Sequence, residues 1–107
     1  MQTTQANPQP LSEVITELDF ESLKELRSFI RVANNLKQLA KNCNPAVIRE
    51  AVKLEKHRKS AIETIRKSWL ERKVISENTA RKAIDLIYMQ YNDALASAEN
   101  SLSFCLR

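Results

Sequence analysis

Apolar side chains recur at intervals of three and four residues through most of the chain, which is the period of an amphipathic helix. These stripes cover residues 20–42, residues 45–73 and a segment from 76 to at least 100. The last stripe is the most regular, as an antiparallel bundle or coiled coil requires. The predicted inward residues are Leu26, Phe29, Ile30, Ala33, Leu36, Ala40 and Cys43, then Val47, Ala51, Leu54, Ala61, Ile62, Ile65 and Trp69, then Ala80, Ile84, Ile87, Tyr91, Ala94, Ala98 and Leu102.

A shorter amphipathic segment precedes the three long stripes. Apolar residues from Leu11 to Leu18 repeat at helical spacing, which predicts a short helix that opens near Ser12. Asp19 suits a fresh N-cap, so we expect this helix to be separate, although the phase also allows one continuous helix from Leu11. Residues 1–10 are polar, and we expect a flexible lead-in there.

The predicted connections between the long helices are short. Asn44 suits a helix cap and Pro45 the first helical position, while Ser76 suits the cap of the last helix. Short connections force neighbouring helices to run antiparallel. We therefore predict an all-α fold, an antiparallel three-helix bundle with a short N-terminal helix, as a single domain over residues 11–107.

The composition supports helices and argues against several kinds of chemistry. The 107 residues include no glycine, on which tight hairpins, phosphate-binding loops and dinucleotide folds depend. His57 is the single histidine, and there is no Cys/His cluster with metal-ligand spacing. We expect a protein that is not an enzyme and that needs no cofactor or metal.

The two cysteines and the hydropathy bear on location. Cys43 and Cys105 are far apart and lack CxxC spacing, so we expect reduced thiols, with a disulfide as the alternative. No apolar run approaches the ~20 residues that span a bilayer, and the N-terminus has no basic or hydrophobic signal segment. We expect a cytoplasmic protein with no membrane partner.

The positive charge is concentrated in the middle of the chain and along two helix faces. The formal net charge is +4, and such an excess favours phosphate partners. At ~100° per residue, Lys, Arg, Asn and Gln gather opposite the apolar stripe of the first long helix, and a second basic row follows the outer side of the next. The candidate contacts to a nucleic-acid backbone are Lys24, Arg27, Arg31, Lys41, Arg49, Lys53, Lys56 and Lys67.

Arg58 is an exception, because its phase places it in the middle of the apolar face of the second long helix. A guanidinium there must pair with an acid or extend to an edge of the bundle. An internal salt bridge is the simpler interpretation, and a contact to phosphate or to another subunit is the alternative. The candidate partners within the chain are Asp19, Glu55 and Asp85.

Leu86, Tyr88 and Met89 fall outside the predicted inward stripe of the last helix. Exposed apolar residues on a small bundle often mark a protein interface, although scattered surface hydrophobes are also common. We therefore expect these three residues to contact another protein subunit.

A glycine-free helical bundle with two basic outer rows and an apolar patch resembles the small helical subunits of multi-subunit CRISPR effector complexes. The resemblance rests on architecture and charge over residues 11–102. It implies a non-catalytic subunit that holds RNA or single-stranded DNA through the backbone, without reading sequence, and that packs against other subunits or further copies of itself. The alternative is a helical interaction module, such as an adaptor, chaperone or inhibitor. A DNA-reading helix-turn-helix protein is a third hypothesis.

Overall fold

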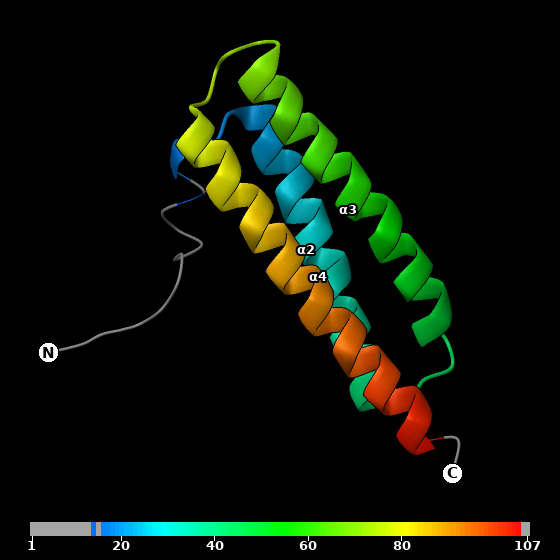
Figure 1. Cartoon of the computed structure of the whole chain (residues 1–107). Helices are drawn as coiled ribbons and strands as arrows, with labels where there is room; N and C mark the ends of the chain where they lie inside the picture. The colour runs from blue at the N-terminus through cyan, green and yellow to red at the C-terminus, as the bar shows by residue number, and fades with distance from the viewer. Residues whose placement is uncertain (1–13, 15, 106–107) are drawn as a thin grey trace, which may run out of the picture.

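Three long helices form the computed structural model, which describes Val14 and residues 16–105, with side chains through Leu102. The helices are α2 (Phe20–Lys41), α3 (Val47–Leu70) and α4 (Glu77–Cys105). They lie side by side, and each runs opposite to the one before it in the chain (Figure 1). Every pair of helices is in contact, and the described residues form no strand. The predicted all-α, antiparallel three-helix bundle is confirmed.

The chain leaves helical conformation just before α2. Val14, Thr16 and Glu17 are helical, but Leu18 and Asp19 are not. This break agrees with a separate N-terminal segment and disagrees with one continuous helix. The start predicted near Ser12 and the flexible lead-in lie outside the described residues.

The core is a single cluster of apolar side chains from all three helices, and it includes the fully buried Leu26, Leu54 and Ile87. Most predicted inward residues are buried or lie at the edge of this cluster. The prediction that Cys43 points inward is wrong, because this residue is exposed. The sequence pattern also missed several buried residues, since each helix contacts two neighbours and buries an arc wider than one stripe. These additional buried helix residues are Ser22, Val32, Glu50, Ser68, Thr79, Ala83 and Leu86.

The caps explain where the helices begin. Ser76 caps α4 as predicted, because its Oγ accepts a hydrogen bond of 3.1 Å from the Thr79 backbone N–H. Asn44 was predicted to cap the next helix, and its Oδ1 does accept a hydrogen bond of 2.9 Å from the Ala46 N–H just before α3. However, α3 begins at Val47, so Pro45 lies in the turn and not in the first helical position.

Both connections between long helices contain a left-handed residue, even though the chain has no glycine. Cys43 has φ 52° and Lys73 has φ 56°. At the end of α2, the Asn44 N–H bonds to the Leu39 carbonyl at 3.0 Å, and the Cys43 N–H bonds to the Ala40 carbonyl at 3.1 Å. This is a Schellman cap, in which glycine is the usual residue. The absence of glycine therefore does not prevent left-handed turns in this chain, but each such turn carries the steric free-energy cost of a left-handed angle at a residue with a Cβ atom.

Cys43 is disulfide-bonded. The expectation of a reduced thiol is therefore wrong for this residue. Spacing along the sequence could not decide the question, because the state of a cysteine depends on what the fold brings next to it.

Candidate nucleic-acid interface

The basic side chains of α2 lie on its solvent side, as the helical phase predicted. Lys24, Arg27 and Arg31 are exposed and line a shallow hollow of about 200 Å³. They lie together because positions three and four residues apart are neighbours on a helix surface. Phe20 lines the same hollow and is itself 76% exposed, although the sequence pattern had not marked it as a site residue.

The basic residues of α3 form a second row. Arg49, Lys53 and Lys56 are exposed and follow one another at three- and four-residue spacing. At ~1.5 Å per residue, this row is roughly 10 Å long. It is therefore long enough to reach more than one phosphate of an extended strand.

Two polar contacts fix the register between α2 and α3. Asn35 donates a hydrogen bond of 2.8 Å to Glu50, and Ser60 donates one of 2.9 Å to Glu25. Each bond joins a residue of α2 to one of α3, at successive levels of the antiparallel pair. Arg31 lies between these two levels on α2.

This register brings the two basic rows side by side. Arg31 of α2 and Lys53 of α3 line one open hollow of about 420 Å³. Lys56 lines the next hollow, of about 330 Å³, at the level of Ser60. The rows thus form a single surface across two helices, here called the basic face, which comprises Lys24, Arg27, Arg31, Arg49, Lys53 and Lys56.

Two carboxylates line the hollows of the basic face, Glu25 beside Lys56 and Glu50 beside Lys53. The Glu50 side chain is only 11% exposed, and its bond to Asn35 uses one of its oxygens. Lys53 lies 3.9 Å from Glu50, which is a long ion pair. Across the described part of the chain, the other basic-face residues form no ion pair within the protein. Their charges are therefore available to an external anion.

Two of the predicted contact residues do not join the basic face. Lys67 is exposed but forms an ion pair of 3.5 Å with Glu63. Lys41 is exposed at the last residue of α2 and lines none of the hollows described above. Arg49 lines none of them either, but it lies one helical turn from Lys53, whereas Lys41 is more than two turns from Arg31. The structure therefore does not bring these two lysines together with the other six.

Arg58 is paired inside the protein. Its Nη2 donates a hydrogen bond of 2.8 Å to Glu55, and its guanidinium lies 5.0 Å from the ring centre of Tyr91 and 5.7 Å from that of Tyr88. Tyr91 also donates a hydrogen bond to Glu55. The bond to Glu55 raises the pKa of Arg58, and the bonds from Arg58 and Tyr91 lower the pKa of Glu55. The internal salt bridge is confirmed, with Glu55 as its acid.

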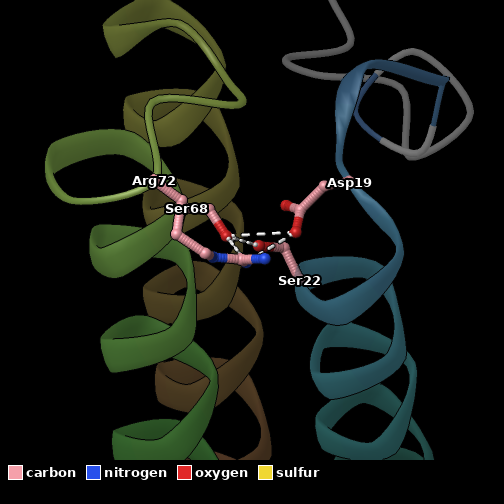
Figure 2. A network of polar contacts seen from close by, with 4 residues as sticks. All are labelled: Asp19, Ser22, Ser68 and Arg72. Carbon is pink, nitrogen blue, oxygen red and sulfur yellow. Dashed lines mark hydrogen bonds and ion pairs between the residues drawn. The ribbon is translucent and has the colours of Figure 1, made fainter.

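A polar network joins the start of α2 to the end of α3 (Figure 2). Arg72 and Ser68 donate hydrogen bonds of 2.8 and 3.1 Å to Asp19, and the Ser22 and Ser68 hydroxyls lie 3.0 Å apart. Arg72 also donates to Ser68. Burial raises the pKa of Asp19, but hydrogen bonds from Ser22, Arg72 and Ser68 outweigh burial, so the net pKa is lowered. Asp19 is the one carboxylate of this network, and we interpret the network as a structural clamp that holds the start of α2 against the end of α3.

The predicted protein interface is only partly present. Leu86 is 4% exposed and belongs to the core, so its assignment to a docking surface is wrong. It is buried because α4 contacts both other helices, which widens the inward arc beyond the predicted stripe. Tyr88 and Met89 are 41% and 44% exposed and remain accessible.

Comparison of this chain with known protein families, curated proteins and solved structures found no match. Among the described residues, no helix has the length and apolar character to cross a membrane. In the same part of the chain, no group of three or more His, Cys, Asp or Glu residues is placed to hold a metal ion. The interpretation of the site therefore comes from its geometry and charge.

Proposed function

We propose that this protein is a non-catalytic subunit that binds the backbone of RNA or single-stranded DNA without reading its sequence. The observation that carries the proposal is the basic face, where Arg31 and Lys53 from two helices line one hollow. A strand that lies along the α2–α3 groove would meet cations on both sides. Phosphate oxygens accept hydrogen bonds from Arg and Lys, and such contacts carry no sequence information.

The proposal includes a place in a larger ribonucleoprotein assembly, as the resemblance to the small subunits of CRISPR effector complexes implies. A shallow, open surface on a small bundle holds a strand weakly when it acts alone. Several copies, or neighbouring subunits, would raise the affinity by binding one strand at several points. The disulfide at Cys43 is more typical of an oxidising compartment than of the cytoplasm. The proposal therefore covers strand binding and assembly, and leaves the cytoplasmic location out.

The direct test is fluorescence polarisation with labelled 20-nucleotide RNA and DNA strands of two unrelated sequences. Binding of single strands changes with salt by a log–log slope of about −0.7 per phosphate contact, so four contacts predict about 50-fold weaker binding from 50 to 200 mM NaCl. We expect this loss for both sequences alike. Binding that ignores salt, or that discriminates strongly between the sequences, would count against the proposal.

A second candidate function is an interaction module that binds an acidic protein. Ile48 and Val52 favour it, because they are 61% and 57% exposed one helical turn apart on α3, close to Arg49. Replacing both with serine should abolish capture of a protein partner from the native host while leaving strand binding intact. Capture that is released by nuclease treatment would instead indicate a nucleic-acid bridge.

A further inference from the structure

A second cationic site lies between α3 and α4, whereas the hollows shared by the two basic rows lie between α2 and α3. It is an open hollow of about 430 Å³ lined by Arg58, Lys59, Ile62, Glu63, Arg66 and Tyr88. Small-molecule sites have volumes of about 300–1,000 Å³, so this hollow is large enough for a nucleotide-sized ligand. No residue of the basic face lines it.

Arg58 is a fixed guanidinium in this hollow. Its side chain is only 16% exposed, its bond to Glu55 is 2.8 Å long, and it lies close to the rings of Tyr88 and Tyr91. Its Nε is buried and has no hydrogen-bond partner among the described residues, so any donor capacity left for a ligand lies on the Nη groups, of which Nη2 already bonds to Glu55. Because the Arg58 side chain is already held in one conformation, ligand binding does not have to order it, and the entropic cost of binding is lower.

Two exposed cations, Lys59 and Arg66, line the hollow beside Arg58. Arg66 is exposed and forms no ion pair among the described residues, while Lys59 is 70% exposed and only 3.8 Å from Glu55 in a weak surface pair. Glu63 also lines the hollow, but it pairs with Lys67 at 3.5 Å on the outer side of α3. The three cations outnumber the two nearby carboxylates, Glu55 and Glu63, so the hollow keeps a modest positive charge, which a concave surface concentrates.

Tyr88 gives the hollow an aromatic wall. Tyr88 is 41% exposed, although it lies next to the largely covered side chain of Arg58. Exposed aromatic rings beside cations are the arrangement on which nucleic-acid bases stack. The phosphate and the base of one nucleotide thus have matching groups in the same hollow.

From these contacts we propose that the hollow between α3 and α4 binds a nucleoside monophosphate unit, with its phosphate on Arg58, Lys59 and Arg66 and its base against Tyr88. The unit has two sources, a free nucleotide or the phosphorylated end of a strand. The site does not rest on the proposed function of the basic face, because the two surfaces share no residue.

The test follows the NMR signals of the Tyr88 ring and the Ile62 methyl groups while the wild-type protein is titrated with AMP, adenosine or a five-nucleotide DNA carrying a 5′-phosphate. We expect AMP to shift these signals and adenosine to shift them far less. Tighter binding of the phosphorylated strand than of AMP supports the strand end as the source, and the reverse supports the free nucleotide. Equal shifts with AMP and adenosine, or none with any of the three, would overturn the site.

Two charge-matched double variants separate this site from the basic face. Lys59→Gln with Arg66→Gln should weaken AMP binding at least about tenfold, because charge-assisted hydrogen bonds are lost. Arg31→Gln with Lys53→Gln removes the same charge and should leave AMP binding unchanged. Arg58 is kept in both, since its removal would take away its hydrogen bond to Glu55 and its cation–π contact with Tyr91. Equal effects of the two double variants would contradict a site in this hollow.

Discussion

Asn35 of α2 donates a hydrogen bond of 2.8 Å to Glu50 of α3, and this bond holds the carboxylate in the interface below the basic face. Glu50 is thereby largely withdrawn from solvent, with a side chain 11% exposed. The bond also sets the register that brings Arg31 next to Lys53. The same contact thus aligns the helices and limits the negative charge that a bound strand would meet.

Replacing Glu50 with glutamine should strengthen strand binding. The amide keeps a hydrogen bond with Asn35 while removing one negative charge near Arg31 and Lys53. A unit charge at ~4 Å in water is worth about 1 kcal/mol, so we expect roughly a threefold to fivefold lower Kd by fluorescence polarisation. The control is Glu99→Gln, which removes an exposed charge from α4. An equal gain in both variants would show a general effect of net charge.

The stability of the bundle should fall in acid partly through Asp19. Its pKa is lowered below the usual 3.8 in the folded state, so the unfolded chain binds more protons around and below that value. The stabilisation is present above the unfolded pKa and is lost as pH falls through the lowered folded pKa.

Urea unfolding measured from about pH 6 down to pH 2 would detect this contribution. Asp19→Asn should lower the free energy of unfolding at neutral pH and flatten its decline in acid. The control is Asp93→Asn, at an exposed ion pair with Lys37 outside the clamp. If the wild type and Asp19→Asn decline in parallel, Asp19 does not contribute in this way.

Lys73→Gly should stabilise the protein. Lys73 has φ 56°, a left-handed angle that glycine adopts without steric cost, although glycine also loses more backbone entropy on folding. We expect a net gain of about 0.5 to 1 kcal/mol, seen as a rise in Tm of a few degrees. Lys73→Ala serves as the control, since it removes the same side chain and keeps the steric cost. Equal Tm values for the two variants would argue against a strained turn.

Leu86 and Met89 should respond very differently to truncation. Leu86→Ala opens a cavity in the core and should cost about 2 to 5 kcal/mol of unfolding free energy. Met89→Ala changes an exposed side chain and should stay within about 0.5 kcal/mol. Chemical denaturation measures both. A small loss for Leu86→Ala would show that the residue lies at the surface after all.

The sequence predicted the helices well because their signals are local. Spacing, the Ser76 cap and the short connections are each visible within a few residues, and they fix both the helix order and the antiparallel packing. The basic rows were also visible, since they depend on the phase within one helix. Their union into one face was not, because it depends on the Asn35–Glu50 register between helices.

The errors come from features that only packing decides. Leu86 lies beside the predicted stripe, and the second neighbour of α4 buries it. Ser22 and Ser68 look like ordinary polar residues, but they meet each other and Asp19 across two helices. The state of Cys43 and the left-handed angle at Lys73 likewise depend on how the chain turns back on itself.

The salt dependence of strand binding by Arg31→Gln with Lys53→Gln tests the central claim most directly. If these two side chains contact phosphates, the log–log slope of affinity against salt should shrink by about 1.4 relative to the wild type, for RNA and DNA alike. The control double variant, Arg81→Gln with Lys82→Gln, removes the same charge from α4 and should keep the wild-type slope. A slope that stays unchanged in the first variant, or that falls equally in both, would contradict strand binding through the basic face.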